Sequence, residues 1–281
     1  MIMKITKGGG ELEGERKTIN VRHVRAANLL SATKLGGDFA INPYVGCPHK
    51  CMYCYAACIN WSGEERGEPW GDFLDVKDPA KPIDPAKIFR KRVMFSSMTD
   101  AYNPYEKKAE VTRGILKQLI PAEAKITVIT KSALVTRDID LFRQFPYVKV
   151  IFSFSSLDDD FRRKVEPYAS PPAKKIAALK ELKEAGIAAG VFVAPTFPAI
   201  SDPVAITHAV APYVRKMTYD TLNLRWKNRD VVLGFIRREY PQLAELYDDI
   251  YLRGNKRYWI GLRKEVRAAC SEERLNCGVC F

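Results

Sequence analysis

The chain has 281 residues and a formal net charge of +12, because 45 lysines and arginines outnumber 33 aspartates and glutamates. Hydrophobic residues make up 47% of it, which is enough for a packed core and excludes wholesale disorder. No apolar run approaches the roughly 20 residues of a transmembrane helix, and the N-terminus lacks the apolar core of a signal peptide. We therefore expect a cytoplasmic protein with no membrane partner.

The excess of positive charge favours a partner that carries phosphate, since basic surfaces attract nucleic acids and nucleotides. A basic surface that only keeps the protein soluble explains the same excess, so the charge alone leaves both interpretations open.

In chain order, residues 1–37 are polar, basic and glycine-rich, and we interpret them as an N-terminal extension. Between residues 38 and 226, apolar runs typical of strands buried in a parallel sheet alternate with amphipathic segments. The expected strands are 39–45, 92–97, 125–130, 149–155, 189–195 and 220–226. The expected helices are 106–120, 137–145, 170–186 and 202–214, and prolines at the start and Gly186 at the end make 170–186 the clearest.

Six strands that alternate with helices predict a parallel α/β sheet with right-handed crossovers. Six units are two fewer than a closed eightfold barrel needs, so a partial (β/α)6 TIM-type barrel over 38–226 and an open doubly wound sheet both fit. In either architecture, ligands bind at the carboxyl ends of the strands. Residues 227–281 are predicted to be helical and to cap the barrel, with a cysteine-rich tail.

The seven cysteines form two groups, at 47–58 and 270–280. Cytosolic thiols stay reduced, so we expect these groups to hold metal rather than to form disulfides.

Cys47, Cys51 and Cys54 have the spacing C-x3-C-x2-C and directly follow the first expected strand. Three thiolates on a short loop can hold one face of a cubane cluster and leave one iron open. A zinc site or a closed [4Fe–4S] cluster needs four ligands instead. The three cysteines are therefore our candidate metal ligands.

The remaining polar residues of this loop carry weaker signals. Cys58 lies about one helical turn beyond Cys54, and we interpret it as a small buried residue or as part of a second site. We expect His49 and Lys50 to be exposed loop residues, although positive charge near a cluster raises its potential.

The motif C-x3-C-x-aromatic-C, with Tyr53 as the aromatic residue, resembles the signature of the radical S-adenosylmethionine (SAM) superfamily. The segment "NPYVGCPHKCMYCYA" together with "TKSALVTRDIDLF" is similar to the branch that contains spore photoproduct lyase, and the resemblance covers about residues 38–225. It implies a [4Fe–4S] cluster whose open iron chelates SAM. It also implies an electron donor such as flavodoxin or ferredoxin, and cleavage of SAM to a 5′-deoxyadenosyl radical that abstracts hydrogen from substrate. The enzyme would be a lyase or a modifying enzyme, with DNA repair as the activity of that branch.

The resemblance also implies where SAM lies. In the family, the loop after the second strand receives the methionine amino group, and Ser97, Thr99 and Asp100 are the acceptors there. The family's usual Gly-Gly-Glu pattern is absent from this chain, and a turn capped by these side chains explains them equally well.

Polar residues at other strand ends complete the expected SAM site, together with Tyr53. Lys131 follows the third strand, and Ser153 and Ser155 alternate to one side of the fourth. Asn223 and Arg225 share a face at the sixth. For the serines the alternative is a packed layer of small residues inside a barrel, and for Arg225 it is a structural ion pair.

Cys270, Cys277 and Cys280 have the spacing C-x6-C-x2-C. Three interpretations compete: an auxiliary [4Fe–4S] cluster, a zinc site, and redox or hydrogen-donating thiols on a mobile tail. Spore photoproduct lyase carries a hydrogen-donating cysteine in the body of its chain. Nothing matches it here between 58 and 270, so the tail cysteines or a tyrosine replace that donor, or the chemistry differs.

The expected substrate is a nucleic acid or a nucleotide-like molecule. The segment 254–264 interleaves basic residues with Tyr258 and Trp259, a mixture that can grip phosphates and stack bases. An amphipathic helix with a solvated basic face explains it as well. The alternative function is radical SAM modification of a peptide or small metabolite with the help of a C-terminal auxiliary cluster. A non-catalytic metal-binding module would have no use for an open iron.

Overall fold

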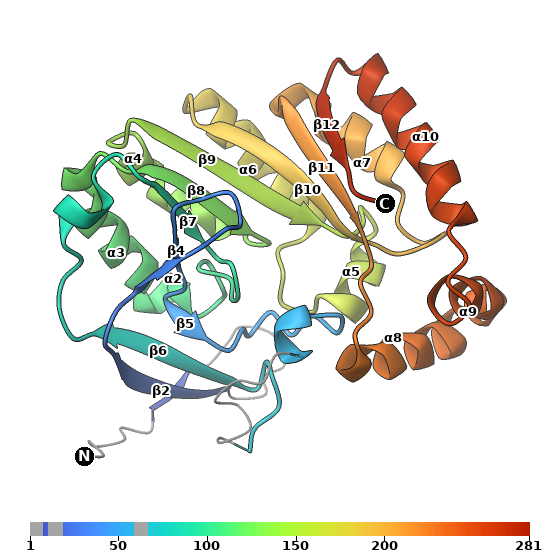
Figure 1. The fold of residues 1–281 in the computed structure, drawn as a ribbon, viewed down its shortest axis with the longest axis horizontal. Coiled ribbons are helices and arrows are strands. Elements are labelled where there is room, and N and C mark those ends of the chain that lie inside the picture. Colours follow the sequence, from blue (N-terminus) through green and yellow to red (C-terminus); the bar gives the residue numbers. More distant parts are fainter. Residues whose placement is uncertain (1–7, 11–18, 59–66) are drawn as a thin grey trace.

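An eight-stranded sheet crosses the computed structural model, which describes residues 8–10, 19–58 and 67–281 (Figure 1). The strand order is β12-β11-β10-β9-β8-β7-β4-β3, and all neighbours pair in parallel except β3 with β4. The strands are β3 (Leu30–Ala32), β4 (Phe39–Ile41), β7 (Arg92–Phe95), β8 (Lys125–Thr130), β9 (Tyr147–Phe154), β10 (Ala188–Thr196), β11 (Lys216–Thr221) and β12 (Asn276–Val279).

The expected α/β class with a mostly parallel sheet is confirmed. The two edge strands, β12 and β3, do not pair with each other, so the described strands form an open sheet and not a closed barrel.

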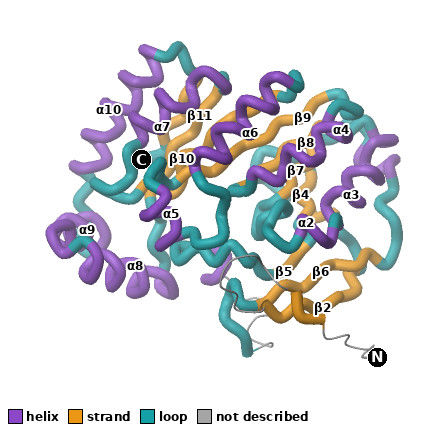
Figure 2. Tube along the Cα trace, turned by 180° about the vertical axis from the view of Figure 1, so that it is seen from behind, coloured by secondary structure: helices purple, strands orange, loops and turns teal. Residues whose placement is uncertain are grey.

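Helices α3, α6, α7 and α10 lie across one face of this sheet, as the view from behind shows (Figure 2). The α-helices are α2 (Glu106–Ala109), α3 (Val111–Leu119), α4 (Ile139–Phe142), α5 (Asp159–Val165), α6 (Pro172–Glu184), α7 (Pro203–Val210), α8 (Trp226–Glu239), α9 (Ala244–Tyr251) and α10 (Arg257–Glu272). Short 3-10 helices are η1 (Tyr55–Cys58), η2 (Pro85–Ile88), η3 (Ile120–Ala122), η4 (Ala133–Asp138), η5 (Ala211–Tyr213) and η6 (Pro241–Leu243). Within the described ranges, no helix is both long and apolar enough to cross a bilayer.

The apolar core lies on the helix-covered face of the central strands, because along β8 and most of β9 buried residues alternate with half-buried ones. The continuous apolar runs predicted full burial on both faces, and this is wrong for the second face. Val150, Phe152 and Phe154 of β9 are fully buried, and Leu179 and Leu182 of α6 belong to the same cluster of core residues. The helices therefore seal one face, and the carboxyl ends of the strands are left to the loops.

A second, smaller sheet supports the loop that follows β5. Its order is β1-β2-β6-β5, with β1 (Gly8–Gly10), β2 (Ile19–Ala26), β6 (Phe73–Pro79) and β5 (Tyr44–Val45). Tyr44, Leu74 and Val76 are buried in one small core beneath it. The strand expected at 39–45 is thus divided into β4, which joins the large sheet, and β5, which joins the small one.

Two expected elements are wrong in detail. The strand expected at 220–226 is β11, which begins at Lys216 and ends at Thr221, so the following residues form the approach to α8. The helix expected over 106–120 is divided into α2 and α3 because Glu110 adopts φ = 50°, which no continuous helix permits. The region 227–281 is helical as expected, but it also supplies β12, the edge strand of the large sheet.

Candidate active site

The three cysteines of the candidate cluster lie on a loop that leaves β5 at Gly46 and ends in η1. Cys47, Cys51 and Cys54 are all half-buried, and the loop turns tightly because Lys50 N donates to Cys47 O (3.3 Å) and Cys54 N to Cys51 O (3.1 Å). Among the described residues, no three His, Cys, Asp or Glu side chains converge on a point that suits a single metal ion. A cubane spreads its thiolates over separate irons, so its ligands stand further apart than those of one ion.

Gly46 sets the start of this loop. Its φ is +87°, and a Cβ at this position would lie 2.4 Å from the backbone oxygen of Phe73 in β6. The Thr99 hydroxyl donates to the Gly46 carbonyl (2.6 Å) from the loop after β7. Only glycine therefore lets the chain pass between β6 and the loop after β7.

His49 is buried against Asp100, with its Nδ1 3.3 Å from the carboxylate, so the expectation of an exposed loop residue is wrong. Burial lowers the pKa of a histidine, but the Asp100 carboxylate and the Cys47 thiol outweigh burial and raise the pKa of His49 to about 10. For Cys47, burial raises the pKa and the neighbouring His49 lowers it, and the balance is a lowered pKa. A buried imidazolium thus favours the thiolate form of Cys47, the form that binds metal.

The carboxylate of Asp100, an expected SAM contact, binds other groups of the protein. Its two oxygens accept from Thr130 Oγ1 (2.8 Å), Lys131 N (2.8 Å) and Tyr102 N (2.9 Å), besides the contact with His49. A carboxylate has about four lone-pair sites, and these contacts fill them. Asp100 therefore ties the ends of β7 and β8 to the cysteine loop.

Helices α5 and α8 hold the other side of the loop. Met52 N donates to Val165 O (3.0 Å) at the end of α5, and Asn228 Nδ2 in the first turn of α8 donates to Tyr53 O (2.8 Å). The Tyr53 hydroxyl donates to Glu166, and its ring packs edge-on against Phe197. Sequence reasoning missed Glu166 and Asn228, which follow no motif.

The structure brings Lys131 and Ser153 together, as expected for a shared site. Lys131 Nζ donates to Ser153 Oγ (3.0 Å), which donates to Ala194 O (2.9 Å). Burial lowers the pKa of Lys131, but the charges of Glu166 and Cys51 reverse this and raise it. Lys131 therefore stays a cation beside the cysteine loop.

Three buried polar atoms around the loop have no hydrogen-bond partner: His49 Nε2, Ser155 Oγ and Glu166 Oε2. Buried polar atoms are almost always paired, so unpaired ones call for a ligand or water. The three-thiol donor set and these atoms fit a cluster that carries a polar organic ligand.

The other expected SAM residues lie around η1, at the end of the cysteine loop, or on the approach to α8. Ser97 is half-buried and accepts from Asn42 Nδ2 (2.8 Å). Asn223 and Arg225 are exposed on the segment between β11 and α8, where Arg225 N donates to Asn228 Oδ1 (2.7 Å). The Ser97 carbonyl accepts from the Tyr55 hydroxyl at the start of η1, and Arg225 is close enough for its charge to act on Tyr55, so both lie beside the end of the cysteine loop.

The C-terminal cysteines do not form a three-cysteine metal site. Cys270 at the end of α10 and Cys277 in β12 form a disulfide, and Cys280 is a free, exposed cysteine. The chain reverses at Arg274 (φ 54°) and lays β12 beside α10, so the two Cα atoms lie 6.3 Å apart, within the span of a disulfide. The expectations that all three tail cysteines bind metal and that the chain has no disulfide are therefore wrong, whereas redox or hydrogen-donating thiols stay a prediction.

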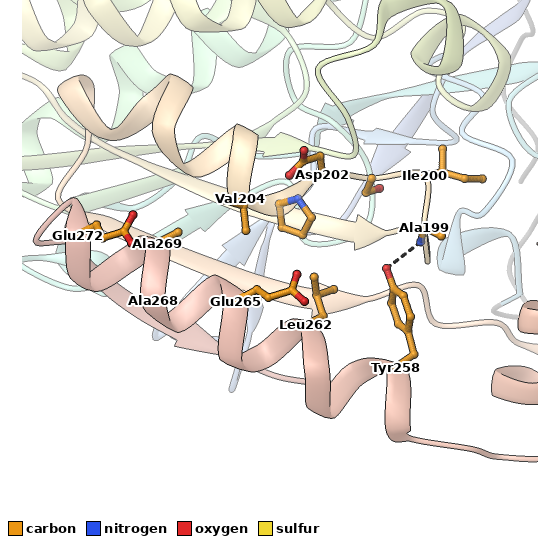
Figure 3. A pocket seen from close by; sticks show the side chains of 12 residues that line it. Ala199, Ile200, Asp202, Val204, Tyr258, Leu262, Glu265, Ala268, Ala269 and Glu272 are labelled. Carbon is orange, nitrogen blue, oxygen red and sulfur yellow. Dashed lines mark hydrogen bonds between the residues drawn. The ribbon is translucent and has the colours of Figure 1, made fainter.

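The cleft in Figure 3 has a volume of about 710 Å³ and lies between α10 and the loop after β10. It is acidic, with Asp202, Glu265 and Glu272 among its lining residues, and it includes no residue of the cysteine loop. The Tyr258 hydroxyl accepts from Ala199 N (2.7 Å), and Trp259 is 7% exposed, so these rings are engaged in packing and are not the free stacking surface expected from 254–264.

Comparison with known proteins agrees with this geometry. The family model of the radical SAM superfamily matches residues 41–203. An uncharacterized protein of Methanocaldococcus jannaschii is 31% identical over 230 residues, which cover 81% of this chain and 86% of the relative. One of Acidianus two-tailed virus is 35% identical over 176 residues, 59% of this chain and 58% of the relative.

Solved structures share the fold. A spore photoproduct lyase complexed with dinucleoside spore photoproduct has a TM-score of 0.65 at 15% identity and covers 93% of this chain and 82% of that one. SuiB of Streptococcus suis bound to S-adenosylmethionine has a TM-score of 0.54 at 12% identity, over 86% of this chain and 49% of that one. With the family model over more than half of its length and a relative above 30% identity, this chain belongs to the radical SAM superfamily.

Proposed function

We propose that the protein is a radical SAM enzyme that holds a [4Fe–4S] cluster with Cys47, Cys51 and Cys54 and acts on a nucleic acid or nucleotide-like substrate. The observation that carries the proposal is the set of three thiols on one clamped loop inside the region that matches the superfamily. When bound, the cluster and SAM supply an electron transfer that cleaves SAM and generates a radical able to abstract hydrogen from substrate.

The chain's own residues prepare this site. His49 favours the Cys47 thiolate, and Asp100 holds His49 in place. Lys131 and Ser153, together with the unpaired oxygens of Ser155 and Glu166, offer donors and acceptors for the amino, carboxylate and hydroxyl groups of SAM. We assign Thr99 and Asp100 to positioning the loop, and Tyr53 to orienting Glu166.

Polar residues at the rim are assigned to the substrate side. Ser97, Asn223 and Arg225 lie at the carboxyl ends of β7 and β11, where ligands of parallel sheets bind. We also propose that the open sheet is a partial barrel spanning 38–226, with 1–37 as an extension and 227–281 as a cap.

Two features support a nucleotide-like substrate: the net charge of +12 and the fold shared with a lyase whose structure holds a dinucleoside photoproduct. The alternative substrate, a peptide or small metabolite, has no support from a three-cysteine auxiliary cluster, because Cys270 and Cys277 are bonded to each other.

The test is anaerobic reconstitution of wild-type protein and single variants, with iron and sulfide counts. We expect about four irons per chain in the wild type, and loss of cluster and of 5′-deoxyadenosine formation in Cys47→Ala, Cys51→Ala and Cys54→Ala. Cys58→Ala is the matched control in the same loop and should keep both. A cluster that survives all three substitutions, or one lost equally with Cys58→Ala, would refute the assignment.

A further inference from the structure

A second cleft, of about 530 Å³, is lined by the end of α9, the first turns of α10 and the residues after β12. Thr221, the last residue of β11, also lines it, so the cleft lies at the carboxyl-end edge of the sheet. Nothing in the proposed cluster or SAM site uses it.

Arg263 is the unusual residue of this cleft. It is half-buried, its Nε is shielded from solvent without a hydrogen-bond partner, and its guanidinium makes no ion pair with a described carboxylate. Arg113 and Arg137, by contrast, each bind buried Asp138. A buried guanidinium N–H without a partner is unfavourable unless an anion or a water molecule satisfies it, and the other donors of Arg263 are free to bind the same anion.

Other groups in the cleft share this preference for an anion. The Tyr251 hydroxyl is buried without a partner, and Lys256 adds a second cation at the N-terminal end of α10, where the helix dipole is positive. No aspartate or glutamate is among the described residues that line the cleft. The acidic cleft of Figure 3 uses other residues of the same helix, so α10 separates two sites of opposite charge.

The cleft also has an apolar side. Ile260 is 53% exposed at its edge, and the rings of Trp259 and Phe281 pack with centroids 5.4 Å apart in its wall. A ligand that fits has an anionic group and a flat apolar part.

We propose that this cleft binds a nucleotide unit, with its phosphate on Arg263 and Lys256 and its base against Ile260. The guanidinium matches two phosphate oxygens at once, which a lysine cannot do. The choice of a nucleotide rests on the proposed function, whereas the anion site itself does not.

The test is calorimetric titration of the full chain with thymidine, thymidine 5′-monophosphate and the dinucleotide TpT. We expect the monophosphate to bind more tightly than thymidine. If TpT binds about as tightly as the monophosphate, the cleft accepts a backbone phosphate. If TpT does not bind, the cleft requires a terminal phosphate.

Arg263→Met should weaken binding of the monophosphate about tenfold or more, since a charged hydrogen-bonded pair is lost. Lys264→Met, on the same helix but outside the cleft, should change binding by less than about twofold, because exposed charges contribute little.

Two further measurements keep the result interpretable. Arg263→Met should fold with a ligand-free melting temperature no lower than that of the wild type, because it removes an unpaired charge. Binding should be unchanged in Cys47→Ala, so loss of the cluster does not affect this test. The proposal is overturned if the monophosphate binds no better than thymidine, if Lys264→Met weakens binding as much as Arg263→Met, or if Arg263→Met alone unfolds the chain.

Discussion

At the scale of single residues, the cysteine loop depends on contacts that the motif does not reveal. The spacing of Cys47, Cys51 and Cys54 predicted a loop built for metal, but His49 was expected to be exposed. Its burial arises from Asp100, fifty-one positions further along the chain, and a contact of that kind leaves no local pattern. Glu166 was missed for the same reason.

Gly46→Ala should destabilise the protein by about 2–4 kcal/mol, because a Cβ there meets the Phe73 carbonyl and φ is positive. Gly36→Ala is the matched control, since its φ is +85° but nothing lies within 4 Å of the added carbon. It should cost only about 1 kcal/mol. Denaturant unfolding measures the unfolding free energy of both variants. Equal decreases would show that contact between the added Cβ and the Phe73 carbonyl does not contribute to the loss of stability.

Lys175 gives a pH prediction. It is fully buried, and burial lowers its pKa to about 8, although the charge of Glu166 opposes this. The unfolded chain therefore holds the proton more tightly between pH 8 and 10.5, and stability from this group rises with pH across that window.

We expect the unfolding free energy of the wild type, relative to Lys175→Met, to increase by about 3 kcal/mol from pH 8 to 10.5. Exposed Lys180→Met is the control and should show no such trend. If the difference in unfolding free energy between the wild type and Lys175→Met does not change with pH, Lys175 is not desolvated in the folded protein.

At the scale of elements, the buried strands of the large sheet were predictable and the peripheral ones were not. The apolar runs at 125–130 and 149–155 correspond to β8 and β9, which bury alternate residues under the helices and keep most of the others half-buried. β2 was not predicted, although "INVRHVRA" has an alternating pattern, because residues 1–37 were interpreted from their polarity alone. β12 was not predicted because its segment was interpreted only from the spacing of its cysteines. The predicted helix 106–120 is interrupted at Glu110, which has a left-handed backbone conformation. The periodicity of apolar residues in this segment does not indicate that interruption.

The disulfide fastens β12 to α10, so its removal should loosen the edge of the sheet. A disulfide that closes the short loop between Cys270 and Cys277 stabilises the folded protein by about 2–3 kcal/mol. We expect Cys270→Ser/Cys277→Ser to lower the unfolding free energy by that amount and to speed amide exchange in β12. Cys280→Ser is the control and should change neither, and an unaffected double variant would show that the bond adds no stability.

At the scale of the whole molecule, the cysteine loop is held between two bodies of structure. The small sheet and β7 fix it through Gly46 and Thr99, and helices α5 and α8 fix it through Met52 and Tyr53. The three thiols are therefore presented by the fold as a unit at the carboxyl ends of the strands, where a parallel sheet binds its ligands.

The most direct test of this account is the electron paramagnetic resonance spectrum of the reduced, reconstituted protein with and without SAM. The account predicts about four irons per chain, a [4Fe–4S] signal, and a change in that signal when SAM is added, because one iron has no protein ligand. A cluster whose spectrum is unchanged by SAM, or a loop that holds zinc, would contradict it.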